Sequence, residues 1–363
     1  MVTQRGSDSR NLFLAGNMFR GGLLRLPEVS VIATVLNEAE DIGRLVESLT
    51  AQTLQPAQIV IVDGGSSDGT WEKLQRYASE YPLLRVIRDE TCNLKSSRGP
   101  IARGRNVAIR HAPSTIIACA DAGCSYARDW LERLTAPIFA GHSEYSLGGS
   151  CLDLADATIW DLAAAPFLGI KMRNGERTRS CTARSMAFGK DIWRRVGGFP
   201  ENSLFGEDSL FDVRVREIVE PAFVEGAMAC YRPQFTFRSA ARTIARYAAA
   251  DGALGIRRSR LTRMSLRCLA EVVVLALLPW AWWPALIVFS LEAYFALQLD
   301  VRGLLAHRSF RALGARLLFS LFVPWICAWS YIRGAITGSN LPNTQNASTD
   351  STSTGDDADG PHT

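Results

Sequence analysis

The sequence predicts an α/β fold built on a doubly wound, mostly parallel sheet. Residues 59–63 read Ile-Val-Ile-Val-Asp, and a continuous β-branched run of this kind is typical of a parallel strand covered on both faces. Residues 29–35 (VSVIATV) form a second such run. The segment after it, residues 42–49, has apolar residues at i, i+3, i+4 and i+7, which is the spacing of one helical face. Two strand–turn–helix units in tandem predict half of a doubly wound sheet.

Further elements follow in order along the chain. The strands expected from short apolar runs are residues 83–87, 115–120, 145–151, 186–188 and 222–230. The helices expected from apolar residues at helical spacing are 69–79, 98–111, 129–139, 190–196 and 209–218.

Polar side chains follow the first two strands, where open α/β sheets bind their ligands. Asn37 and Glu38 come after the first strand, and Asp63 ends the second. A carboxylate at Asp63 suits the hydroxyls or ring nitrogens of a nucleotide, and an ordinary acidic turn is the alternative. Asp68 is expected to cap the helix that starts near Thr70. Neither the dinucleotide-binding glycine fingerprint nor a Walker-type loop occurs in the sequence, so those nucleotide folds are disfavoured.

Four motifs in order, the first made of two paired segments, resemble those of one family. VSVIATVLNE (29–38), paired with IVIVDGGSSDGT (59–70), resembles the start of a family 2 glycosyltransferase. Residues 103–109 resemble that family's helix with an Arg-Asn pair, and residues 118–123 stand where the family has its metal-binding Asp-x-Asp. Residues 197–208, with Gly-Gly-Phe-Pro-Glu and Gly-Glu-Asp, resemble the acceptor-side motif that carries the catalytic base. The resemblance covers roughly residues 28–240 and implies the GT-A nucleotide-sugar fold.

The resemblance implies a role for individual residues. Asp208 would be the general base that takes the proton of the acceptor hydroxyl, in a single displacement that inverts the anomeric configuration. Glu207 would orient Asp208 or contact the acceptor. Arg105 would grip the diphosphate with its guanidinium fork. The residues expected to bind the nucleotide sugar are Thr34, Asn37, Glu38, Asp63, Arg105, Asn106 and Asp121. Asp121 is also the expected ligand of Mg²⁺ or Mn²⁺, which would bridge the donor phosphates.

The sequence departs from the family pattern at two places. Position 123 is glycine rather than aspartate, so one carboxylate remains to hold the metal. Phosphates and waters would then fill the other coordination positions, or else Asp121 contacts the ribose or the sugar. Position 64 is glycine where many relatives have a second aspartate, so recognition of the base is left to Asp63.

Composition changes sharply in the last third of the chain. Residues 238–267 hold eight arginines and one acid, Asp251. Two uncharged runs follow, 272–291 and 317–332, and the first is long enough to enter a bilayer. The arginines suit a cytoplasmic face with anionic lipids, although a buried core helix is the alternative for each run. Four arginines in the linker 300–316 argue against a single crossing and favour a hairpin that turns at the cluster of Trp280, Trp282 and Trp283.

A chain of 363 residues suits one domain of about 230 residues plus an appendage. The expected parts are a flexible arm at 1–27, a GT-A domain at 28–240, a basic amphipathic connector at 241–267, membrane-associated helices at 268–336 and a disordered tail at 337–363. Eight scattered cysteines without a C-x-x-C pair indicate buried thiols in a reducing cytosol.

The favoured function is transfer of a sugar from a nucleoside-diphosphate sugar to a lipid-linked or envelope glycan acceptor. The enzyme would sit at the inner (plasma) membrane, with its catalytic domain in the cytoplasm, membrane lipids as partners and no nucleic acid. One alternative is a processive polysaccharide synthase, although the Gln-x-x-Arg-Trp motif common in those enzymes does not occur. The other is a non-enzymatic nucleotide-sugar-binding membrane scaffold, which the glycine at position 123 supports.

Overall fold

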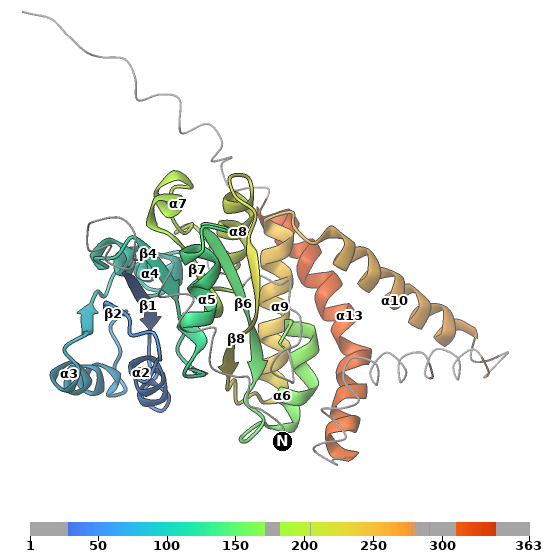
Figure 1. Ribbon diagram of the computed structural model, residues 1–363. Coiled ribbons are helices and arrows are strands. Elements are labelled where there is room, and N and C mark those ends of the chain that lie inside the picture. The colour runs from blue at the N-terminus through green and yellow to red at the C-terminus, as the bar shows by residue number, and fades with distance from the viewer. Residues whose placement is uncertain are drawn as a thin grey trace, which may run out of the picture. The chain divides into compact units, whose positions relative to one another are not determined.

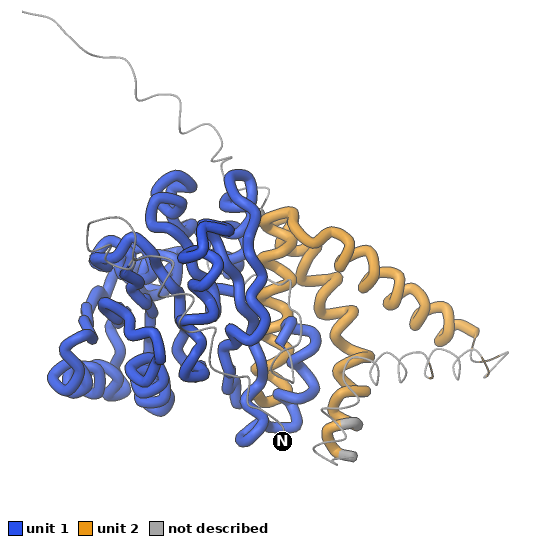
Figure 2. Tube along the Cα trace, in the orientation of Figure 1, with its two compact units in different colours: residues 1–234 blue, residues 235–363 orange. Residues whose placement is uncertain are grey.

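The computed structural model describes residues 28–170, 182–203, 205–277 and 310–338, together with three single residues between 278 and 291. The chain divides into two compact units, residues 1–234 and 235–363 (Figure 2). The division lies a few residues before the domain boundary expected at 240. The expected N-terminal arm, most of the first uncharged run and nearly all of the tail lie outside the described residues.

The first unit is built on one eight-stranded sheet (Figure 1). Its order is β3-β2-β1-β4-β7-β6-β8-β5. The pairs β1–β2, β1–β4, β2–β3 and β6–β8 are parallel, and the other three pairs are antiparallel. The mostly parallel α/β sheet expected from the sequence is therefore confirmed. The strands are β1 Val29–Val35, β2 Gln58–Asp63, β3 Leu84–Arg88, β4 Ile116–Cys119, β5 Cys124–Tyr126, β6 Tyr145–Leu152, β7 Met186–Gly189 and β8 Ala222–Tyr231.

Helices cover both faces of this sheet, which explains the continuous apolar runs in β1 and β2. Val31 and Ala33 belong to one buried cluster, and Ile32 between them belongs to the other. The first cluster includes side chains of α2, α3 and α5, and the second includes side chains of α4, α7 and α8. The helices are α2 Ile42–Thr50, α3 Thr70–Glu80, α4 Pro100–His111, α5 Trp130–Phe139, α6 Ile159–Ala164, α7 Lys190–Arg195 and α8 Glu207–Arg216, with 3₁₀ turns η1 Ala165–Leu168 and η2 Ala183–Ser185.

Helix α4 lies directly against the end of β1. A Cβ added at Gly104 would come within 2.2 Å of Thr34 Oγ1, so the backbone of the helix touches the strand. Only glycine permits this approach without moving one element. The next two residues of α4, Arg105 and Asn106, are thereby held beside the edge of the sheet where β1 ends.

Two details differ from the sequence-based expectation. The N-cap position of α3 is Gly69, in the left-handed region with φ of 95°, so Asp68 lies one residue before it, although its carboxylate still accepts from the amide of Thr70, the first residue of the helix. Asp68 accepts hydrogen bonds from Thr70 and from the Ala39 amide, which joins the loops after β1 and β2. Helix α8 begins at Glu207, two residues earlier than expected, and this places Glu207 and Asp208 in its first turn.

The described part of the second unit consists of three helices, α9 Phe237–Ala253, α10 Arg258–Leu277 and α13 Phe310–Gly338. A capping box between Thr236 and Ser239 starts α9. Helix α13 packs along α9 and also contacts α10. Among the described residues, one stretch, Gly314–Thr337, is long and apolar enough to cross a membrane, and 44% of its most apolar window is buried.

Candidate active site

Three neighbouring parallel strands bring the expected donor-binding side chains to one edge of the sheet. Strand β1 lies between β2 and β4. Asn37 and Glu38 follow β1, Asp63 ends β2, and Asp121 follows β4 by two residues. Because parallel strands end at the same edge of a sheet, Asn37 and Asp121 lie at the same edge although they are 84 positions apart in the chain. This juxtaposition is the one expected from the sequence.

Asp63 is fully buried and half of its carboxylate is committed to the loop that follows it. Its Oδ1 accepts hydrogen bonds from the amides of Gly65 at 2.6 Å and Ser66 at 2.7 Å. Its Oδ2 is buried and has no hydrogen-bond partner among the described residues. A buried carboxylate oxygen of this kind carries a desolvation cost that a donor group on a ligand would offset.

The loops after β1 and β2 are joined by hydrogen bonds around Asn37 and Glu38. Asn37, with φ of 56°, accepts from the Ser67 amide through its side chain, and its own amide donates to Ser66 Oγ. The Glu38 amide donates to Thr70 Oγ1 at 2.8 Å. Burial raises the pKa of the Glu38 carboxyl to about 7, and the nearby charges of Asp41, Asp121 and Asp68 add to this effect. Glu38 is therefore close enough to Asp121 to feel its charge.

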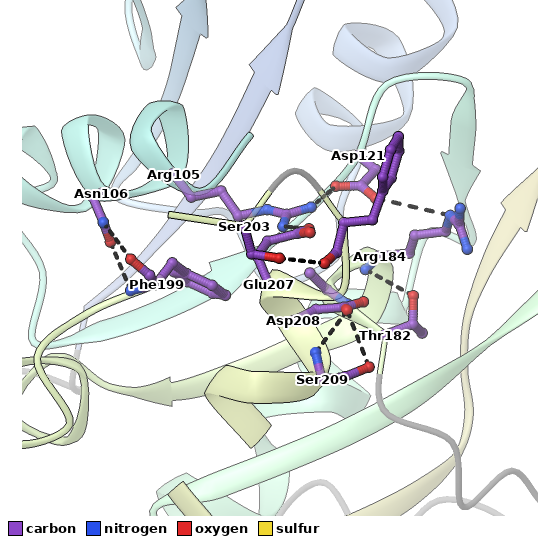
Figure 3. A network of polar contacts seen from close by, with 12 residues as sticks. Arg105, Asn106, Asp121, Thr182, Arg184, Phe199, Ser203, Glu207, Asp208 and Ser209 are labelled. Carbon is purple, nitrogen blue, oxygen red and sulfur yellow. Dashed lines mark hydrogen bonds and ion pairs between the residues drawn. The ribbon is translucent and has the colours of Figure 1, made fainter. Parts of the chain in front are cut away.

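Arg105 is the centre of a buried ion-pair network (Figure 3). Its Nη1 donates to Glu207 Oε1 at 2.6 Å and its Nη2 donates to Asp121 Oδ1 at 2.7 Å. The side chain is 3% exposed and its guanidinium lies over the Phe199 ring. Both carboxylates raise the pKa of Arg105 despite burial. The guanidinium fork therefore joins the end of β4 to the first turn of α8, and in this arrangement it grips carboxylates rather than a diphosphate.

Asp208 lies beside this network and is more accessible than Glu207. Its Oδ1 accepts from the Ser209 amide at 2.7 Å, and its Oδ2 lies 3.4 Å from the Ala183 amide (Figure 3). Glu207 is buried, and burial together with the adjacent Asp208 charge raises the pKa of Glu207. The two neighbouring carboxylates thus have different surroundings, because Asp208 is partly exposed and Glu207 is buried and paired with Arg105.

Arg184 is a further charged residue of the site that the sequence analysis did not identify. It precedes β7, its Nε lies 3.8 Å from Asp121 Oδ2, and its guanidinium stacks over the Tyr231 ring at 4.3 Å. Tyr126 fixes the same corner, because its hydroxyl accepts from the Asp121 amide and donates to the Arg184 carbonyl. The available signal was an arginine two residues ahead of an expected strand, between the Asp121 and Asp208 motifs.

Asn106 has its side-chain amide fully engaged within the protein. Its Nδ2 donates to the Phe199 carbonyl at 2.8 Å and to Glu201 Oε1 at 2.9 Å. Its Oδ1 accepts from Trp193 Nε1 and from the Phe199 amide, both at 2.9 Å. Two donors and two acceptor positions are all that an amide offers. The arrangement ties α4 to the loop before α8, which fits a positioning role better than the contact with the donor expected from the sequence.

The residues around Asp121 offer few ligands for a metal ion. Among the described residues no group of three or more His, Cys, Asp or Glu side chains is arranged to hold a metal ion. Asp121 offers one carboxylate, whose Oδ1 is bonded to Arg105 and whose Oδ2 lies beyond hydrogen-bonding distance of Arg184. These residues fit an ion that arrives with phosphate ligands of its own, and do not fit an ion held by protein ligands alone.

Comparison with known proteins shows which family the first unit is similar to. Residues 30–178 match the family model described as Glycosyl transferase family 2. The chain is 29% identical over 195 residues to "Glycosyltransferase AglE" of Haloferax volcanii, a match covering 50% of this chain and 59% of that protein. It is 31% identical over 199 residues to "Succinoglycan biosynthesis protein ExoA" of Rhizobium meliloti, covering 51% of this chain and 57% of that protein. The match therefore spans less than two thirds of either relative.

Among solved structures, the chain resembles the mannosyltransferase PcManGT from Pyrobaculum calidifontis in complex with GDP-Man and Mn2+. The identity is 22%, the TM-score is 0.48, and the alignment covers 86% of this chain and 87% of that one. The family match over residues 30–178 and the mixed sheet make the first unit similar to members of glycosyl transferase family 2, whose GT-A fold was expected from the sequence.

Proposed function

We propose that this chain is an inverting glycosyltransferase that uses a nucleoside-diphosphate sugar, with Asp208 as general base. The observation that carries the proposal is the placement of Asp63, Asp121 and Asp208 beside one edge of the sheet, through residues far apart in sequence. The edge where Asp63 and Glu38 lie would receive the nucleoside, because the buried Asp63 Oδ2 can accept from a base or ribose donor.

In the proposed reaction the acceptor hydroxyl oxygen attacks the anomeric carbon from the face opposite the diphosphate. A bond forms between that oxygen and the anomeric carbon, and the bond from the carbon to the diphosphate oxygen breaks. The bonding electrons leave with the nucleoside diphosphate, and the hydroxyl proton passes to the Asp208 carboxylate. Arg105 holds Glu207 and Asp121 at 2.6 and 2.7 Å, so it positions both sides of the site through ion pairs.

A divalent ion would enter with the donor, bound through Asp121 and the donor phosphates. The acidic side chains of the site are Glu38, Asp63, Asp121, Glu207 and Asp208, and its basic side chains are Arg105 and Arg184. This set is short of positive charge for a diphosphate, particularly when Glu38 is ionised. When bound, the ion would neutralise phosphate charge as the diphosphate leaves.

We also propose that the acceptor is a lipid-linked or envelope glycan at the inner membrane, with the first unit in the cytoplasm. The name of the rhizobial relative, a succinoglycan biosynthesis protein, supports a polysaccharide product. The arginine-rich second unit with its apolar α13 supports attachment to a membrane.

The test is release of nucleoside diphosphate by the purified full-length chain from a panel of nucleotide sugars. We expect one donor to be preferred, and Asp63→Asn to bind that donor about 10–100-fold more weakly, because it replaces the buried acceptor Oδ2 with a donor group. The loop should survive, since the remaining oxygen still accepts from Gly65 and Ser66. Asp89→Asn is the control, because that carboxylate lies on the next loop and is engaged with Thr91. Release from no donor would contradict the proposed function.

A further inference from the structure

Helix α13 has two apolar faces along its length. One face is buried and includes Ala315, Phe319, Val323, Cys327 and Tyr331. The opposite face is exposed, at 39–71% of each side chain, and consists of six large apolar residues at spacings of three and four: Leu318, Phe322, Trp325, Trp329, Ile332 and Ile336. We call this second face the apolar stripe. A continuous exposed stripe of this kind marks a surface that is covered by a partner or a lipid phase.

The buried face of α13 packs along almost the whole of α9. The Phe237 and Phe319 rings meet edge to face with centroids 5.3 Å apart. Toward the other end, a Cβ at Gly252 would come within 2.0 Å of the Tyr331 carbonyl oxygen, and the Tyr331 hydroxyl donates to the Ile256 carbonyl. The two helices therefore run in the same direction side by side, as Figure 1 also shows. Any position that α13 takes in a bilayer is shared by α9.

Helix α9 is unsuited to the interior of a bilayer. Arg238, Arg242 and Arg246 occur at every fourth residue and all three are exposed. The stretch from Phe237 to Gly252 is about 22 Å long at the helical rise, and it flanks the middle of α13. The hydrocarbon core of a bilayer is about 30 Å thick. If α13 crossed the bilayer, the arginines of α9 would lie within the hydrocarbon, where charged side chains are costly and rare.

We propose that α13 does not cross the membrane, but lies in the plane of one anionic leaflet with its apolar stripe in the boundary between headgroups and acyl chains. This rests on the proposed membrane attachment and specifies its geometry. An anionic lipid is favoured because residues 235–277 and 310–338 are strongly basic, with eleven arginines and two acids. Trp325 and Trp329 in the stripe are the residue type that prefers the membrane interface.

The proposal predicts that both ends of α13 lie on the same, cytoplasmic, side. In cells expressing the full chain and a cytoplasmic biotin ligase, one version carries a biotin-acceptor peptide directly before Phe310 and another carries it directly after Gly338. Both versions should be biotinylated, and both should stay with the membrane in alkaline carbonate. Labelling of only one version would show that α13 crosses, and labelling of neither would place α13 on the other side of the membrane. Either result overturns the proposal, and so does release of the chain by salt alone.

A second measurement tests the stripe directly. The full chain is floated with vesicles of phosphatidylcholine alone or with added phosphatidylglycerol. Trp329→Gln combined with Ile336→Gln should lower binding to the anionic vesicles in high salt by at least about tenfold, because apolar contact is not screened. Leu94→Gln is the control, an equally exposed apolar residue on the first unit. Unchanged flotation of the double variant would overturn the proposal. So would a stable dimer of wild-type chain that the same two substitutions dissociate, since a second copy would then cover the stripe.

The glycosyl transfer proposal is tested separately by nucleotide release, so the two can fail independently. A chain that releases nucleoside diphosphate but is labelled at one end of α13 only would refute the in-plane helix alone. A chain that is labelled at both ends and resists carbonate but uses no donor would refute the transfer reaction alone.

Discussion

Removing Arg105 should destabilise the first unit far more than removing a nearby surface arginine. Arg105→Met keeps the length of the stem but deletes the guanidinium that bridges Asp121 and Glu207 at 2.7 and 2.6 Å. Glu207, 9% exposed, is then left buried without its counter-ion, whereas Asp121 is 24% exposed and keeps Arg184 nearby. Breaking a buried pair in this way costs about 3–5 kcal/mol.

The matched control is Arg103→Met, two residues earlier on α4. Arg103 is 40% exposed and pairs with Glu201 at 3.2 Å, and exposed pairs contribute about 0–1 kcal/mol. For a unit of this size, 1 kcal/mol shifts the melting temperature by roughly 2–4 °C. We therefore expect a drop of roughly 6–20 °C for Arg105→Met and at most about 4 °C for Arg103→Met.

The assay is thermal unfolding of the full chain in mild detergent, followed by near-ultraviolet circular dichroism. Adding Glu207→Gln to Arg105→Met should recover part of the loss, because it removes the buried uncompensated charge. Equal shifts for the two arginine variants would refute the reasoning that Arg105 organises the site through buried ion pairs.

Two further predictions concern pH and metal. Donor affinity should fall as pH rises through about 7, because Glu38 has a raised pKa and its ionisation adds negative charge near Asp121; Glu38→Gln should flatten that dependence when donor binding is titrated at several pH values. The same raised pKa means that the folded state favours the protonated Glu38 carboxyl. The stability that this carboxyl contributes is therefore present below its ordinary pKa of 4.5 and is lost as pH rises to about 7. Nucleotide release should require Mg²⁺ or Mn²⁺, and calorimetry should detect metal binding only with the nucleotide present, since no group of three or more His, Cys, Asp or Glu side chains is arranged to hold a metal in the part of the chain that the structure describes. Full activity in excess chelator would contradict the metal prediction. The pH prediction would be contradicted if donor affinity in Glu38→Gln depended on pH as it does in the wild-type chain.

The strands and most helices were predictable because each long element has an apolar pattern of its own. Strands β1 and β2 are buried on both faces and read as continuous β-branched runs, so their positions and the polar edge after them follow from the sequence. Strand β5, of three residues, and helix α6, of six, were not predicted, although helix α7, which is equally short, was.

The partners of the site residues could not be predicted, because they depend on tertiary placement. The Arg-Asn pair of α4 was expected to face the donor, but besides Asp121 it contacts Glu207, Glu201 and Phe199, which lie 93 to 102 residues further along the chain. Nothing in the local pattern of α4 distinguishes an arginine that grips phosphate from one that bridges carboxylates. Arg184 was missed for the same reason, since its relation to Asp121 depends on how β4 and β7 pair.

Asp208→Asn tests the central claim most directly. The substitution removes the proton acceptor but can keep the hydrogen bond from the Ser209 amide, so the first turn of α8 should survive. Donor binding by calorimetry and nucleoside diphosphate release with a glycan acceptor are measured on the same full-length protein. Glu217→Gln, an exposed carboxylate at the end of the same helix, is the control. We expect near wild-type donor binding and a loss of about 10²–10⁴-fold in release for Asp208→Asn only. Wild-type turnover by Asp208→Asn would contradict its role as the base.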